Sequence, residues 1–118
     1  MSKTLSTLTT LPAEAEGSLH AWRDRLYDEH RFRTEQLTLL DQEITANPRL
    51  RHDGVTMALR AAATAALDDV DAALARMRAG QYGRCVQCTR PIPHDRLDVL
   101  PMAALCMPCQ YEQQTGSR

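Results

Sequence analysis

The chain has 118 residues, and its 14 basic and 15 acidic residues give a formal net charge of −1. Aromatic residues make up only 4% of it, which excludes a large globular core and favours a small fold stabilised by a metal or a long helix pair. The balanced charge argues against a broad nucleic-acid-binding face, and no apolar run resembles a signal peptide or a membrane span. We therefore expect a cytoplasmic protein.

The N-terminal third predicts one long helix. Residues 1–11 are rich in Ser and Thr, and we expect a flexible N-terminus there. The helix is expected from Pro12 to about Ala46, because its apolar residues recur at steps of three and four. The polar stretch of residues 27–36 is expected to be a solvated helix face. The apolar positions are Leu19, Trp22, Leu26, Leu37, Leu40 and Ile44.

A break and a second helix follow. Residues 47–54 contain proline and glycine, and Asn47 or Asp53 could cap the next helix. Residues 55–79 are rich in alanine and carry apolar residues at helical spacing. Gly80 stands where a left-handed C-cap is expected, so the second helix should end there.

The two helices can be folded back on each other about residue 50. The numbers of facing residues then add to about 100 in every pair, so one register satisfies the whole hairpin. We predict a mainly α protein with an antiparallel coiled-coil hairpin over residues 12–80, about 40 Å long. His30 falls opposite Val70, where we expect a partly covered packing residue rather than a ligand. The facing pairs are Ile44 with Met57, Leu40 with Leu59, Leu37 with Ala63, Leu26 with Leu74, and Trp22 with Met77.

Four cysteines form two Cys-x-x-Cys pairs with seventeen residues between them: Cys85, Cys88, Cys106 and Cys109. This spacing is typical of a tetrahedral zinc site, because one tight turn can present both sulfurs of a pair to one metal. Two disulfides or four unrelated buried thiols are the alternatives, and disulfides are disfavoured because nothing indicates secretion. We predict one structural Zn²⁺ held by all four cysteines.

The predicted zinc site is not expected to be catalytic. A catalytic zinc keeps one position open for water, and four cysteines leave none. His94 lies between the pairs and could replace a ligand, which is the lesser alternative. No phosphate-binding loop, nucleophile elbow or acid–base pair accompanies the cysteines. We therefore expect that the protein is not an enzyme.

Residues 81–118 are expected to form the zinc module, which clamps both helices at the base of the hairpin. Pro108 predicts a short C-terminal helix after the second pair. Arg84, Arg90 and Arg96 could offset the −2 charge of a four-thiolate zinc, or could be ordinary surface arginines. The residues expected to pack around the metal are Tyr82, Ile92, Leu97, Val99, Leu100 and Leu105.

The sequence around the cysteines carries three further motifs: Gly80-Gln-Tyr-Gly-Arg-Cys85, Arg90-Pro-Ile-Pro93 and Leu105-Cys-Met-Pro-Cys-Gln110. With them, residues 72–111 closely resemble the DksA/TraR family of bacterial regulators. The resemblance implies a transcription regulator that binds RNA polymerase directly, rather than promoter DNA. Its hairpin would enter the secondary channel and alter open-complex stability. Thirteen of the 14 basic residues are arginine, which suggests a GC-rich bacterial genome of the actinobacterial type.

Two positions depart from the family pattern. Family members that act strongly on initiation carry two aspartates near the hairpin tip, whereas this tip has Arg49, Arg51, His52 and a single acid, Asp53. The resemblance implies that these four residues contact polymerase, although Asp53 is equally suited to cap the second helix. Thr89 stands where a glycine usually follows the second cysteine, so either the turn differs or strain is tolerated.

Other functions stay open. A zinc-ribbon nucleic-acid binder would need a basic surface around the cysteines, yet residues 81–118 hold four arginines against three acids. A coiled-coil adaptor without polymerase activity is favoured by the non-acidic tip. A redox role is a lesser alternative, since zinc-bound thiolates can be oxidised and release the metal. We expect a monomer without sequence-specific DNA binding.

Overall fold

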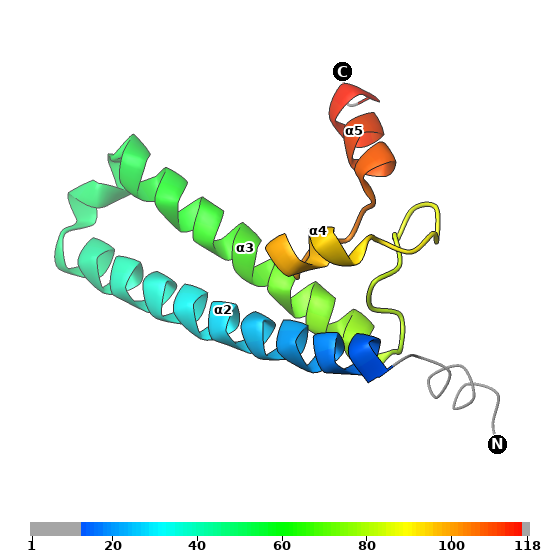
Figure 1. The fold of residues 1–118 in the computed structure, drawn as a ribbon. Coiled ribbons are helices and arrows are strands. Elements are labelled where there is room, and N and C mark those ends of the chain that lie inside the picture. The colour runs from blue at the N-terminus through cyan, green and yellow to red at the C-terminus, as the bar shows by residue number, and fades with distance from the viewer. Residues whose placement is uncertain (1–12, 117–118) are drawn as a thin grey trace.

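The structure, a computed structural model, describes residues 13–116 and has a mainly helical fold without strands in that range (Figure 1). This is the predicted fold class. The predicted flexible segment 1–11 and the helix start at Pro12 lie outside the described residues. The molecule is elongated, with principal extents of 56 × 33 × 24 Å. Its elements are α2 (Ala13–Ala46), the 3₁₀ helix η1 (Pro48–His52), α3 (Gly54–Arg78), α4 (His94–Val99) and α5 (Met107–Gly116).

Helices α2 and α3 form the antiparallel hairpin, and two polar contacts between them fix its register. Arg60 Nε lies 2.7 Å from Asp41 Oδ1, and His30 Nε2 lies 3.1 Å from Asp71 Oδ1. The two residue numbers of each pair add to the same total. This total is close to the sum of about 100 that the apolar residues predict, so the helices pair in the predicted register. The Arg60 guanidinium also holds the pKa of Asp41 below its ordinary value, through its hydrogen bond and then its charge.

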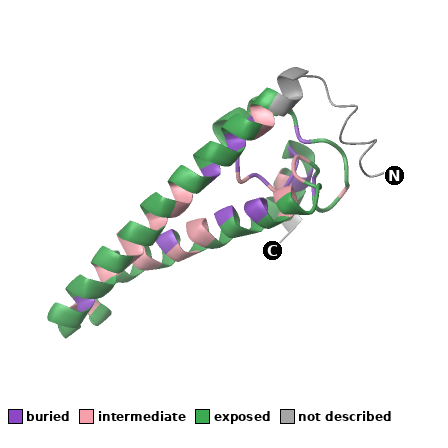
Figure 2. Cartoon of the chain, turned by 90° about the horizontal axis from the view of Figure 1, so that it is seen from below, coloured by how far each residue is buried: buried purple, intermediate pink, exposed green. Residues whose placement is uncertain are grey.

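Apolar packing within the hairpin is concentrated towards its base. Leu26, Val70 and Ala73 are completely buried there (Figure 2). Alanine has a small side chain, so Ala73 allows the two backbones to approach closely. Near the other end of the hairpin the packing is thinner than the pairing predicts, because Met57 and Leu59 remain 37% and 49% exposed. The polar contacts described above therefore supplement a sparse apolar seam.

Both ends of α3 have the predicted caps. Asp53 is the N-cap, and its Oδ2 accepts hydrogen bonds from Thr56 N at 2.9 Å and from Thr56 Oγ1 at 2.7 Å. At the other end Gly80 adopts φ 74°, the left-handed conformation that glycine allows without steric cost. Its N–H donates to Met77 O, and the N–H of the next residue, Gln81, donates to Arg76 O. These two bonds form a Schellman motif, which ends the helix and turns the chain into the zinc module.

Candidate metal centre

The four predicted zinc ligands lie together at the base of the hairpin. The sulfur atoms of Cys85, Cys88, Cys106 and Cys109 all lie within 4.8 Å of one another, and those of Cys88 and Cys106 are 3.7 Å apart. Sulfurs bound at about 2.3 Å to a tetrahedral zinc are separated by about 3.8 Å, so this donor set fits the metal. In the described part of the chain, no other group of three or more potential ligands is this close.

The first cysteine pair lies on a short backbone hairpin formed by residues 83–92. Cys85 N–H donates to Arg90 O at 2.8 Å, and Ile92 N–H donates to Gly83 O at 2.7 Å. After Cys88 the chain passes through Thr89 with φ 65°. The left-handed turn is therefore kept although a β-branched residue occupies it, which is the strained alternative predicted for this position.

The second cysteine pair lies at the start of α5, as the proline after Cys106 predicts. Gln110 N–H donates to Cys106 O at 2.9 Å within the first turn of this helix. The backbone of the first pair is joined to this region by Val86 N–H, which donates to Ala104 O at 2.9 Å. The two turns are thus held together by a backbone hydrogen bond as well as by the cysteines.

Among the three arginines considered for charge compensation, Arg96 lies against the second cysteine pair. Its Nε donates to Leu105 O at 3.0 Å, and another guanidinium nitrogen contacts the sulfur of Met107. Arg84 instead donates to Thr89 O at 3.3 Å, beside the first pair. Arg96 therefore contacts both neighbours of Cys106, the backbone of Leu105 and the side chain of Met107, next to the negatively charged centre.

The packing around the metal centre differs from the prediction at two positions. Ile92, Leu97 and Leu105 are buried as predicted, whereas Val99 and Leu100 are 72% and 43% exposed. Val99 follows Leu97 by two positions on α4, and two helical steps place it on nearly the opposite side of the helix. Pro101 and Ala103 are buried instead, and the half-buried Tyr82 packs against the same cluster.

The zinc module is joined to α2 mainly through Trp22, the only tryptophan of the chain. Its indole Nε1 donates to Asp98 Oδ1 at 2.7 Å, and Arg25 donates to the backbone carbonyl of Asp98. The indole ring also lies 5.7 Å from the Tyr82 ring and meets the His94 ring edge-on at 5.1 Å. His94 is therefore a packing partner of Trp22 and is not among the clustered metal ligands.

Two further side chains link the module to α3: Tyr82, which packs against the buried cluster that includes Val70 and Ala73 and is held within the module by its hydroxyl, and Arg76. Tyr82 donates its hydroxyl to Pro101 O at 2.7 Å, and burial raises its pKa to about 12. Arg76 reaches from α3 to Met102 O and Ala103 O, and burial lowers its pKa. Sequence reasoning missed these contacts and the Asp98 contact, because each joins residues far apart in the chain. The single tryptophan was the sequence feature that could have indicated where the zinc module contacts the hairpin.

The predicted tip residues lie at the opposite end of the hairpin from the cysteines. Arg49, Arg51 and His52 belong to η1, which has no buried residue, and Asp53 is exposed at its end. Hydrogen bonds from the Thr56 hydroxyl and backbone N–H lower the pKa of Asp53. Asp53 is thus an ionised helix cap at neutral pH. The predicted site residues therefore form two separate groups, one at each end of the hairpin.

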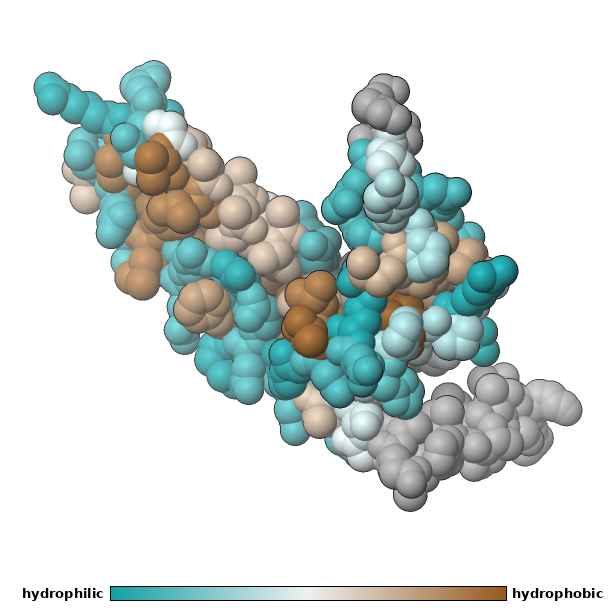
Figure 3. Space-filling view, turned by 45° about the horizontal axis from the view of Figure 1, so that its top comes forward, coloured by the Kyte–Doolittle hydropathy of each residue, from teal (hydrophilic) through white to brown (hydrophobic). Residues whose placement is uncertain are grey.

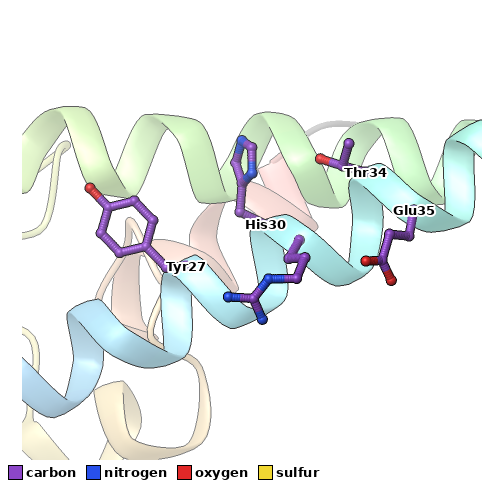
Figure 4. Close-up of a pocket in the computed structure, with 5 residues that line it drawn as sticks. Tyr27, His30, Thr34 and Glu35 are labelled. Atoms are coloured by element: carbon purple, nitrogen blue, oxygen red, sulfur yellow. The ribbon is translucent and has the colours of Figure 1, made fainter.

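A shallow hollow on α2 corresponds to the polar stretch predicted as a solvated face. Tyr27, His30, Arg31, Thr34 and Glu35 line it and project from one side of the helix (Figure 4). His30 already contacts Asp71, and Arg31 contacts Asp28 at 3.3 Å. These are ordinary surface contacts between neighbouring side chains, so we assign no ligand to this hollow.

Comparisons with known proteins agree with this geometry. The family of prokaryotic dksA/traR C4-type zinc fingers matches residues 80–114. An uncharacterized protein from Aquifex aeolicus (strain VF5) is 34% identical over 55 residues, which are 45% of this chain and 38% of that protein. The structure of transcription factor DksA2 from Pseudomonas aeruginosa covers 95% of this chain and 97% of its own, with a TM-score of 0.74 and 24% identity.

The C4 finger match and the sulfur cluster together show a centre for one structural zinc. At 24% identity, the likeness to DksA2 establishes the fold of the hairpin and module. No described helix has both the length and the apolar character needed to cross a membrane. The chain therefore carries a C4 zinc finger of the dksA/traR type at residues 80–114, and its fold is similar to that of DksA2.

Proposed function

We propose that the protein is a transcription regulator that binds RNA polymerase directly by inserting its hairpin into the secondary channel. The observation that carries this proposal is the separation of the two ends of the hairpin. The base is fixed by the zinc module, while η1 at the far end has no buried residue and is free to contact a partner. The DksA fold and the C4 finger support a regulator of this type.

The surface near the tip has the composition of a protein-binding surface. Arg49 and Arg51 are exposed in η1, and the helices that lead to it carry exposed apolar side chains, with Val55 70% and Leu39 61% exposed. Apolar surface gathers over this end of the hairpin in Figure 3. Arginine and apolar residues are common at the centres of protein interfaces, whereas a nucleic-acid interface would need a larger positive excess. This composition supports a protein partner.

Asp53 is the single acid that the tip can bring to the catalytic centre of polymerase. Both of its hydrogen bonds from Thr56 fall on Oδ2, so Oδ1 can face a metal ion or a basic group of the partner. Its lowered pKa keeps the carboxylate negatively charged at neutral pH. We propose that the tip works through this one charge together with Arg49, Arg51 and His52.

The zinc module has a structural role in this proposal. Four thiolates fill a tetrahedral coordination sphere and leave no position for a reacting water, so we propose no enzymatic step. Residues 81–118 instead hold the base of a hairpin formed by residues 12–80. In this arrangement the protein acts as a monomer, through protein contacts and without recognising a DNA sequence.

Binding of the purified protein to core RNA polymerase, in competition with a factor known to occupy the secondary channel, tests the proposal. The wild type is expected to bind and to compete, and deletion of residues 49–53 is expected to abolish competition. Asp53→Asn is the matched variant, because asparagine is as good an N-cap as aspartate but carries no charge. It should bind polymerase yet lose the effect on open-complex lifetime.

A different outcome would point to another function. If the wild type fails to bind polymerase at micromolar concentration, the proposal is wrong and the coiled-coil adaptor becomes the better interpretation. That alternative has one observation in its favour, namely that the only acid of the tip is engaged as a helix cap. Binding that persists after deletion of residues 49–53 would locate the contact elsewhere on the molecule.

A further inference from the structure

A groove lies at the joint between the hairpin and the zinc module, far from the tip. Its volume is about 610 Å³, within the usual range of ligand pockets. Leu19 and Trp22 of α2 and Met77 of α3 form one wall, and Ile92 and Pro93 of the module contribute to the other. The groove is thus a largely apolar cleft whose walls come from two parts of the molecule that the metal centre holds together.

The formally charged side chains that line this groove are both positive, and Tyr82 and His94 are further polar residues of its lining. Arg78 lines it from the last turn of α3, and Arg84 lines it from the module beside Cys85. None of the described side chains that line the groove is acidic. Arg78 is exposed and has no hydrogen bond or ion pair with a described residue, and Arg84 has only the long contact with Thr89 O. Both guanidinium groups are available to an anionic partner.

The partner must therefore offer an apolar group together with negative charge. The N-terminal segment of the chain itself does not fit, since residues 1–12 include one lysine and no acid. We propose that the groove binds an acidic peptide segment of another protein, with an apolar side chain between the walls and flanking carboxylates paired with Arg78 and Arg84. This contact is independent of the proposed tip function, because it lies at the opposite end of the hairpin.

Physical chemistry sets the expected strength and salt dependence of this contact. Exposed ion pairs each contribute little to affinity and are screened by salt, so the apolar anchor supplies affinity while the arginines supply selectivity. Reversal of both charges should therefore weaken binding by roughly tenfold. The same reversal should favour a basic peptide over an acidic one.

Trp22 gives a direct readout, because the only tryptophan of the chain lines the groove. The probe is a capped peptide, Glu-Glu-Leu-Phe-Glu-Glu, titrated into the full-length zinc-loaded protein while tryptophan emission is recorded. We expect a saturable change that high salt weakens, and no saturable change with Lys-Lys-Leu-Phe-Lys-Lys. The double variant Arg78→Glu/Arg84→Glu should reverse this preference. Zinc content and circular dichroism of each variant verify that it is folded.

Arg90→Glu is the matched control, since Arg90 is an exposed arginine of the same module that does not line the groove. It should change the affinity for the acidic peptide by less than about twofold if the contact is local. Equal binding of the acidic and basic peptides would show an apolar site without charge selectivity and overturn the proposal. Absence of saturable binding by the acidic peptide would overturn it as well, as would equal weakening by Arg90→Glu.

Discussion

The base and the tip of the hairpin are stabilised in different ways. The base combines two buried clusters, a cluster of four sulfurs and hydrogen bonds between residues far apart in the chain, such as Trp22 with Asp98. The tip has a five-residue 3₁₀ helix with no buried residue, and its hydrogen bonds join neighbours such as Asp53 and Thr56. Substitutions at the base should therefore affect folding, whereas those at the tip should mainly affect function.

Loss of a metal ligand should have the largest effect, because it should unfold the base of the molecule. Structural zinc binds zinc-finger peptides with about 10–16 kcal/mol, which is comparable to the whole stability of a small domain. We expect Cys106→Ser to release the metal, unfold residues 81–116 and leave α2 and α3 frayed at the base. Zinc analysis and circular dichroism measure both effects. Val86→Ser is the control, because Val86 is 59% exposed between the first two cysteines. Full zinc occupancy in Cys106→Ser would contradict the prediction.

Removal of the indole at the joint should have the next largest effect. Trp22 is 5% exposed, and truncation of a buried aromatic side chain typically costs about 3–5 kcal/mol. We expect Trp22→Ala to lower the unfolding free energy by this amount in a denaturant titration. Tyr27→Ala, at a side chain that is 50% exposed on the same helix, should cost about 0.5 kcal/mol or less. Similar losses in the two variants would show that the joint is not selectively stabilising.

Tyr82→Phe should have a moderate effect that depends on pH. The variant loses the hydrogen bond to Pro101 O, which typically contributes about 1 kcal/mol. Because burial raises the pKa of Tyr82 from 10.0 to about 12, the folded state holds this proton more tightly than the unfolded state. The wild type should therefore lose stability as pH rises from 10 to 12, and Tyr82→Phe should lose less. Parallel alkaline unfolding curves for the two proteins would be inconsistent with this assignment.

The smallest effect is expected at the tip. Asp53→Ala removes the N-cap of α3 and should lower the midpoint of thermal unfolding by roughly a few degrees, while Asp53→Asn should stay closer to the wild type. The pKa of Asp53 is lowered in the folded state, so its contribution is present above pH about 4 and is lost as pH falls further. Scanning calorimetry at neutral and acidic pH measures both effects. If Asp53→Ala lost as much stability as Trp22→Ala, the tip would stabilise the fold as strongly as the base, contrary to the comparison drawn above.

The features that could be predicted from the sequence depend on local spacing. Two residues between cysteines define each half of the metal centre, and helical steps of apolar residues were sufficient to place the hairpin in the register that the Arg60–Asp41 pair confirms. The glycine after α3 likewise marked its end. Each of these predictions uses only a short stretch of sequence, or the constant sum of facing residue numbers in an antiparallel helix pair.

The features that were missed depend on tertiary contacts. Helix α4 has six residues, too few for a periodic signal, and its orientation decides that Leu97 is buried while Val99 is exposed. The partners Trp22 and Asp98 are separated by 76 positions, and nothing in the local sequence of either residue identifies the other. The residues predicted for the tip lie in and directly after η1, but their contacts with a partner cannot be read from spacing and stay a prediction.

The constant register of the hairpin has a consequence for its reach. Residues 33–39 of α2 and 62–68 of α3 lie across from each other, between the Arg60–Asp41 contact and the His30–Asp71 contact. Removal of both segments takes seven residues from each helix, which preserves the coiled-coil repeat and shortens the hairpin by about 10 Å. The metal centre and the tip would keep their own structures while the distance between them changed. The depth to which the tip would enter the proposed partner can thus be varied separately from its chemistry.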